Sequence, residues 1–212
     1  PSCLEWASTF WRERPDLRRA PYRWERSLEG AFDYGKEEVR EHHLRLVREL
    51  FERYDMDGLE LDWLRWVLHF APGGEQQGRK ILTEFVREVR RLIDNSARRV
   101  GHPVKLAVRV PAEPQSCLGL GYDVIAWARE GLIDMITVSS FLGCANFNLP
   151  LDIWRALLGT EIKILAHAES TARPHPSYER TCVSYQFLFA SAASALHRGG
   201  DGIYLFNECY RE

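Results

Sequence analysis

The sequence of 212 residues lacks the short motifs that would assign a chemistry at once. It has no serine nucleophile elbow, no phosphate-binding P-loop and no HExxH zinc motif, so the best-marked esterase, nucleotidase and zinc-protease patterns are excluded. No apolar run approaches the roughly 18 residues of a membrane-spanning helix, and we expect no transmembrane segment. No signal peptide is visible, although the sequence begins at Pro1 and leaves an upstream segment open.

The sequence also lacks a strong excess of either charge. It has 28 basic and 30 acidic residues and a net charge of −2, so we expect neither nucleic acid nor an anionic membrane as a partner. The balance leaves the oligomeric state open. Apolar side chains, in contrast, are plentiful. Of the residues, 45% are hydrophobic and 12% aromatic, which is enough for a sizeable core and argues against disorder.

Cysteine is present in an odd number and without metal-ligand spacing. The five cysteines are Cys3, Cys117, Cys144, Cys182 and Cys209. No CxxC or Cys/His pattern occurs, so we expect free thiols, no metal site and no cofactor. Free thiols favour a reducing compartment.

Helical and strand periodicities alternate along the chain. Residues 1–35 look irregular, with at most one short helix, and residues 64–78 look like a loop. The amphipathic or apolar helical segments are expected at 36–54, 79–99, 121–130, 150–158 and 177–198. The strands are expected at 58–63, 105–110, 135–140, 162–168 and 202–207. Strict alternation of this kind predicts a parallel sheet with right-handed crossovers.

The fold class that fits this alternation is α/β, as a (β/α)8 TIM-type barrel. The loops after the strands are long and those before them short, which is typical of that barrel. A whole barrel needs eight strands and about 250 residues. We therefore expect residues 1–212 to be a single catalytic-type barrel domain covering the last five strands, with the first three upstream of Pro1 or absent. A doubly wound open sheet is the alternative, but residues 64–70 do not form its glycine-rich phosphate turn.

Two acids alternate with apolar residues in the segment 57–63. Glu60 and Asp62 fall on one face of the expected strand, and Leu59, Leu61 and Trp63 fall on the other. A parallel strand is usually buried on both faces, so two carboxylates there are costly unless they meet a cavity, a partner or a ligand. Paired acids near a cleft are what glycoside hydrolysis uses. The alternative is a structural ion network.

The same parity places further polar residues on the inner face of the neighbouring strands. Arg109 can hold Glu60 or Asp62, or grip a substrate oxygen. Glu169 is the candidate for a second catalytic carboxyl, since such pairs usually come from different strands. The candidate substrate-binding residues are Arg109, His167, Ser139, Trp66, Asn207 and Glu208. One phase of the last strand turns Tyr204, Phe206 and Glu208 inward and the other turns Asn207 inward; the pattern does not choose between them.

Several segments resemble glycoside-hydrolase-like (β/α)8 proteins, including an uncharacterised bacterial glycosyl hydrolase-like group. The matching segments are 10–13, 33–34, 38–40, 54–62, 109–111 and 201–207. The resemblance implies a barrel fold and a carbohydrate substrate, without naming the sugar. It does not by itself fix a function.

The strand at 58–63 also resembles the D-x-x-D-x-D-x-E signature of family 18 chitinases. On this sequence the four signature positions are Asp57, Glu60, Asp62 and Leu64. The last is that family's proton donor, and leucine cannot protonate a leaving group. The resemblance thus supports the strand's place in a barrel and argues against chitinase chemistry.

Two functions follow from these residues. The first is a glycoside hydrolase-like enzyme that cleaves glycosidic bonds by carboxylate acid/base chemistry, with Glu60, Asp62 and Glu169 as catalytic residues. The alternative is a catalytically inactive carbohydrate-binding or structural barrel with a buried Glu/Asp/Arg network. A metal-dependent hydrolase or an aldolase fits less well, because no histidine pair or strand-end lysine suits it.

Overall fold

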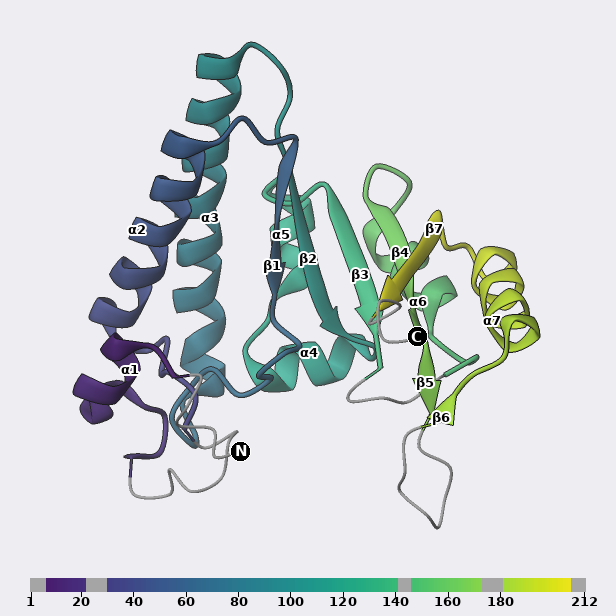
Figure 1. The fold of residues 1–212 in the computed structure, drawn as a ribbon, viewed down its shortest axis with the longest axis horizontal. Coiled ribbons are helices and arrows are strands. Elements are labelled where there is room, and N and C mark those ends of the chain that lie inside the picture. The colour runs from purple at the N-terminus through teal and green to yellow at the C-terminus, as the bar shows by residue number, and fades with distance from the viewer. Residues whose placement is uncertain (1–6, 22–29, 141–145, 173–180, 207–212) are drawn as a thin grey trace. The chain divides into compact units, whose positions relative to one another are not determined.

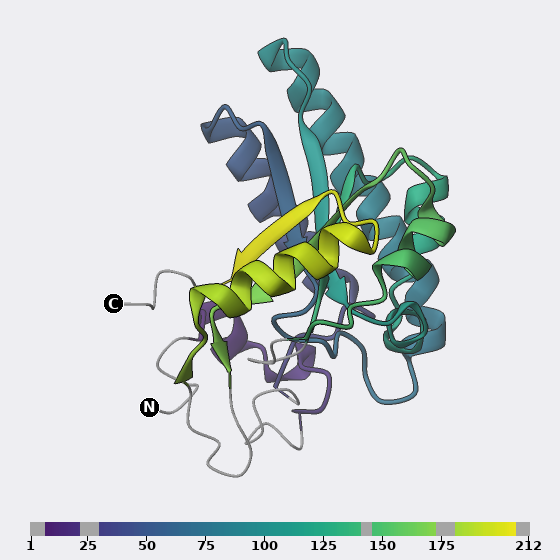
Figure 2. The same ribbon diagram turned by 90° about the vertical axis from the view of Figure 1, so that its right-hand side faces the viewer.

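The computed structural model describes residues 7–21, 30–140, 146–172 and 181–206. Figures 1 and 2 show the elements of the chain from two directions. By its contacts the chain divides into two compact units. The first comprises residues 1–57, 65–104 and 117–127, and the second comprises residues 58–64, 105–116 and 128–212. No helix in the described ranges is long and apolar enough to cross a membrane.

The second unit contains a curled sheet of five parallel strands, in the order β1-β2-β3-β4-β7 (Figure 1). The strands are β1 (Gly58–Asp62), β2 (Lys105–Pro111), β3 (Met135–Ser139), β4 (Lys163–Glu169) and β7 (Gly202–Phe206). The prediction of five parallel neighbours in sequence order is confirmed. This is the architecture of a partial (β/α) barrel.

One face of this sheet is apolar because β-branched and small residues alternate with polar ones. Val108, Ile136 and Ile164 lie side by side in the register and are fully buried. Two helices of the same unit, α6 (Leu151–Leu158) and α7 (Tyr185–His197), pack beside β4, and α7 also contacts β7. The apolar face leaves the other face of each strand for the polar residues of the site.

Aspartates placed directly before two strands fix the register at their amino ends. Asp134 Oδ2 accepts from the Leu106 backbone N–H at 2.8 Å, and the Asp134 N–H donates to the Leu106 carbonyl at 2.8 Å. Asp201 makes the same pair of bonds with Ile164, at 2.8 and 2.7 Å. Each carboxylate extends the ladder by one step, tying its own strand to the preceding one.

The described part of the first unit consists mainly of helices, with irregular segments and one antiparallel bridge between Arg18 and Phe32. Its helices include α1 (Thr9–Glu13), the 3-10 helix η2 (Pro15–Leu17), α2 (Glu37–Arg53) and α3 (Glu75–Val100). The helices α2 and α3 pack on each other through apolar stripes. Helix α3 begins earlier than expected, and the loop prediction for 64–78 is wrong after residue 74. Gly78 lies inside this helix, and a side chain would not fit there because the Phe70 ring lies 2.5 Å from where a Cβ would be.

Three further expectations need correction. The segment 1–35 contains α1 and η2 rather than at most one short helix. The helix expected at 121–130 is observed as α5 (Val124–Arg129), but a helix that was not expected, α4 (Pro114–Leu120), precedes it and ends at Gly121, whose φ is +95°. The helix expected at 177–198 begins only at Tyr185, where Ser184 caps it by accepting from the Phe187 N–H. Ahead of it, β6 (Thr181–Cys182) pairs antiparallel with β5 (Thr171–Ala172).

Candidate functional site

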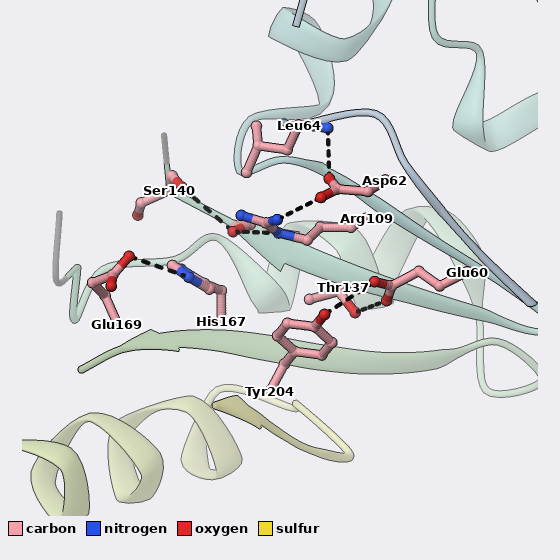
Figure 3. Close-up of polar contacts among 10 residues, drawn as sticks. Glu60, Asp62, Leu64, Arg109, Thr137, Ser140, His167, Glu169 and Tyr204 are labelled. Carbon is pink, nitrogen blue, oxygen red and sulfur yellow. Dashed lines mark hydrogen bonds and ion pairs between the residues drawn. The ribbon is translucent and has the colours of Figure 1, made fainter. Parts of the chain in front are cut away.

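Polar side chains gather on one face of the curled sheet, toward the carboxyl ends of its strands (Figure 3). Parallel strands end at the same edge, so residues of equal parity from successive strands come together. The residues of this group are Glu60, Asp62, Arg109, Thr137, Ser139, His167, Glu169 and Tyr204. They fall into three clusters, each with its own hydrogen bonds.

The first cluster surrounds Glu60. Tyr204 donates from its hydroxyl to Glu60 Oε1 at 3.1 Å, and Thr137 Oγ1 donates to Glu60 Oε2 at 3.4 Å (Figure 3). Glu60 and Tyr204 belong to β1 and β7, the two end strands in the sheet order. Their side chains meet because the sheet curls. Glu60 is half-buried, and the groups that donate to its two oxygens are uncharged hydroxyls.

Burial sets the proton affinity of this carboxyl. It raises the pKa of Glu60, and the nearby negative charge of Asp62 raises it further. The hydrogen bonds from Tyr204 and Thr137 and the charge of Arg109 lower it by less. Burial and the Glu60 charge also raise the pKa of the Tyr204 phenol, which therefore stays a donor. A carboxyl with a raised pKa is the kind of group that serves as a general acid.

The second cluster surrounds Arg109, which is only 4% exposed. Arg109 Nη1 donates to Asp62 Oδ2 at 2.8 Å, and Nε donates to Ser139 Oγ at 3.3 Å. Its guanidinium lies over the Phe206 ring, 4.0 Å from the centroid. Asp62 Oδ1 in turn accepts from the Leu64 backbone N–H at 3.0 Å. The structure thus gives Asp62, and not Glu60, the direct ion pair with Arg109.

The third cluster is a buried histidine and glutamate on β4. His167 Nε2 lies 3.8 Å from Glu169 Oε2, and both side chains are 2% exposed. Thr171 Oγ1 donates to Glu169 Oε1 at 3.2 Å, and the His167 and Phe206 ring centroids are 5.2 Å apart. Burial, helped by the charge of Arg109, lowers the pKa of His167 to about 4. The imidazole is therefore neutral near pH 7.

The remaining predicted site residues are placed as follows. Ser139 lies in the Arg109 cluster. Trp66 is 44% exposed and belongs to the first compact unit. Asn207 and Glu208 lie outside the described residues. Of the two phases considered for the last strand, the one that turns Tyr204 and Phe206 inward is observed.

The sequence placed Tyr204 and Phe206 on the inner face in one of two phases, but it did not predict their contacts with Glu60 and Arg109. Their parity on the last strand was the available signal, but nothing in the sequence pairs a residue of β7 with Glu60 of β1. The described ranges hold no cluster of three or more His, Cys, Asp or Glu side chains that could bind a metal ion.

Leu64 occupies the position that holds the acid in the family 18 signature. Its side chain is buried, with 3% exposed, and its backbone N–H binds Asp62. The position thus contributes a backbone donor and an apolar side chain, and no proton donor.

No protein-family model matches the sequence, and no curated protein matches it. Several solved structures do. A glycoside hydrolase family 18 N-acetylglucosaminidase from Paenibacillus barengoltzii is 13% identical over 70% of this chain and 52% of its own, with a TM-score of 0.46. Chitinase ChiA74 from Bacillus thuringiensis is 14% identical over 81% of this chain and 25% of its own, with a TM-score of 0.38.

An oxaloacetate acetylhydrolase, solved in complex with the inhibitor 3,3-difluorooxalacetate, is 12% identical over 92% of this chain and 70% of its own, with a TM-score of 0.33. The chain spans about half the length of the first of these three structures and a quarter of the second. A function for the chain has to come from its own side chains.

Proposed function

We propose that the chain carries the acid side of a glycoside hydrolase-like active site, with Glu60 as the proton donor to the leaving oxygen. The observation that supports this is the Glu60 cluster: a half-buried carboxyl with a raised pKa, held by two hydroxyls on a barrel-type sheet. The proton leaves Glu60 for the glycosidic oxygen as the bond from that oxygen to the anomeric carbon breaks.

The second carboxyl of such a site stays ionised, as nucleophile or as base for water. Asp62 suits this role because Arg109 supplies its counter-charge and the Leu64 N–H a further donor. Glu169 is the alternative from another strand; its side chain is 2% exposed, so it needs a rearrangement to reach a substrate. Carboxyl groups about 5–5.5 Å apart give retention of configuration, and those about 6.5–9.5 Å apart give inversion.

The proposed substrate is a carbohydrate. Ser139, Arg109 and His167 lie on the same face as the acids, but all three are buried and, like Glu169, would need a rearrangement to contact it. Aromatic faces suit sugar rings, and Tyr204 and Phe206 supply them on the same face of the sheet. Trp66, Asn207 and Glu208 remain proposed substrate contacts.

The test is hydrolysis of a panel of polysaccharides and activated aryl glycosides by the unmodified chain, Glu60→Gln and Glu169→Gln. If Glu60 is the acid, Glu60→Gln loses most turnover on natural sugars, about 100-fold or more, and less on aryl glycosides, whose leaving groups need little protonation. Equal losses on both substrate classes would remove Glu60 from this role. The same contrast in Glu169→Gln would transfer the role to Glu169.

A second function is supported by one observation, the buried Leu64 at the signature's acid position beside the closed Asp62–Arg109 pair. It is a carbohydrate-binding barrel without catalysis. Calorimetric binding of an oligosaccharide that is recovered intact after long incubation would favour this function over the first.

A further inference from the structure

The contact between Glu60 and Tyr204 joins residues 144 positions apart and links the first and last strands of the sheet order (Figure 3). The Tyr204 ring is half-buried beside Phe206, with ring centroids 6.4 Å apart and an interplanar angle of 23°. Packing therefore limits where the Tyr204 hydroxyl can point. The hydroxyl is thereby held within hydrogen-bond distance of one oxygen of the carboxyl, Oε1.

The two oxygens of Glu60 are held unequally. Oε1 receives the Tyr204 hydroxyl at 3.1 Å, whereas Oε2 receives Thr137 Oγ1 only at 3.4 Å, near the limit of a hydrogen bond. Oε2 is the less firmly occupied oxygen and the better place for a transferable proton. A hydrogen bond to an ionised acceptor is about twice as strong as one between neutral groups.

We propose that Tyr204 is the positioning residue of the Glu60 carboxyl: it binds Oε1, leaves the proton on Oε2, and stabilises the carboxylate that remains after the proton has left. This inference rests on the proposed function for its catalytic meaning. When Oε2 gives its proton to the leaving oxygen, the negative charge spreads over both oxygens and the Tyr204 bond strengthens. An interaction that strengthens as the reaction proceeds stabilises the transition state more than the bound substrate, and so it lowers the activation barrier.

The experiment follows the Glu60 side-chain carboxyl by carbon-13 NMR as a function of pH, with Glu60→Gln used to assign the signal. Tyr204→Phe removes the hydroxyl and keeps the ring. Because that hydroxyl stabilises the carboxylate, the midpoint of the Glu60 titration should rise in Tyr204→Phe. Tyr122→Phe is the matched control, since that hydroxyl binds His69 instead, and it should leave the midpoint unchanged.

A second substitution acts in the opposite direction. Site-specific 3-fluorotyrosine at position 204 makes a more acidic phenol of nearly the same shape, so the midpoint should fall. It also serves where Tyr204→Phe does not fold. A midpoint that stays constant in either Tyr204 variant that folds, or that moves in the wrong direction, overturns the proposal.

Turnover separates this inference from the proposed function. If the chain hydrolyses a glycoside, Tyr204→Phe should lower kcat by about tenfold with a smaller change in KM. The alkaline limb of the pH profile of kcat/KM, where the donor loses its proton, should move with the NMR midpoint. If no glycoside is cleaved but the midpoint moves as expected, the proposed function fails while the hold of Tyr204 on Glu60 stands. If the chain is active and the midpoint does not move, the proposed function stands and Tyr204 has no positioning role.

Discussion

Arg109 and Asp62 are direct neighbours in the register of β1 and β2, and their side chains form a 2.8 Å ion pair at the carboxyl ends of these strands. The arginine is buried and the aspartate about one-third exposed. Removal of Asp62 therefore leaves a buried guanidinium without its counter-charge, which is costly. The ion pair holds the Asp62 carboxylate in place, whereas Glu60 is held by the hydroxyls of Tyr204 and Thr137.

A double-mutant cycle measures this pair. Asp62→Asn and Arg109→Gln should each lower the free energy of unfolding by about 2–4 kcal/mol, with a coupling of about 1–3 kcal/mol between them in urea unfolding. The exposed Arg14–Asp16 pair is the control, and Asp16→Asn should lower the free energy of unfolding much less than Asp62→Asn does. Additive losses at Asp62 and Arg109 would mean that the pair contributes no stability.

Glu60→Gln should change how stability depends on pH. Since burial raises the pKa of Glu60 in the folded protein, the unfolded chain releases this proton first. The contribution of protonated Glu60 to the free energy of unfolding is therefore fully present below the ordinary carboxyl pKa, and it is lost as pH rises through the pKa of the folded state. We expect the free energy of unfolding of Glu60→Gln, measured in urea relative to that of the unmodified chain, to be larger at pH 7 than at pH 4. If Glu60→Gln is instead less stable relative to the unmodified chain at pH 7 than at pH 4, the pKa of Glu60 is not raised in the folded protein.

His167 should give the opposite pH dependence. Burial lowers its pKa to about 4, so between that value and the ordinary value of about 6.5 only the unfolded chain takes up the proton. Its contribution is full above about pH 6.5 and declines as pH falls, by at most about 3 kcal/mol. His167→Gln should flatten this part of the stability curve. His69, whose pKa burial lowers to about 3, remains in the variant, and His69→Gln serves as the comparison.

Leu64→Glu restores the acid of the family 18 signature. Because Leu64 is buried with 3% exposed, we expect the variant to lose about 3 kcal/mol of stability and to gain no activity on chitin oligosaccharides. Leu64→Met, of similar volume, should cost less than about 1.5 kcal/mol. A stable Leu64→Glu variant that cleaves chitin would show that only this side chain separates the site from chitinase chemistry.

The strands were predictable because each one alternates polar and apolar residues between glycine, proline and aspartate breakers. The start of α3 was not, since Gly73, Gly74 and Gly78 look like loop residues, and only the Phe70 ring explains a glycine inside the helix. The two-residue strands β5 and β6 are too short to show a period.

The candidate site was predictable up to the choice of partner. Parity placed Glu60, Asp62 and Arg109 on one face, as observed. It could not choose which acid Arg109 binds, because that depends on the register between β1 and β2. It could not find the Tyr204 bond either, since that depends on the curl of the whole sheet.

The aspartates directly before β3 and β7 select one register between neighbouring strands. Asp134 and Asp201 each bond to both backbone groups of a residue on the preceding strand. Asp134→Asn and Asp201→Asn keep an oxygen that can accept from that residue but lose the charge that pairs with Lys105 and Arg155, so each should lower the thermal midpoint. Asp57 stands in the same place before β1 and is exposed. Asp57→Asn should therefore leave the thermal midpoint of residues 1–212 unchanged; a loss as large as that at Asp134 would show that Asp57 is already in use. In the part of the chain that the structure describes, β1 is an end strand of the sheet, so the place of Asp57 fits a further parallel strand pairing with the outer side of β1.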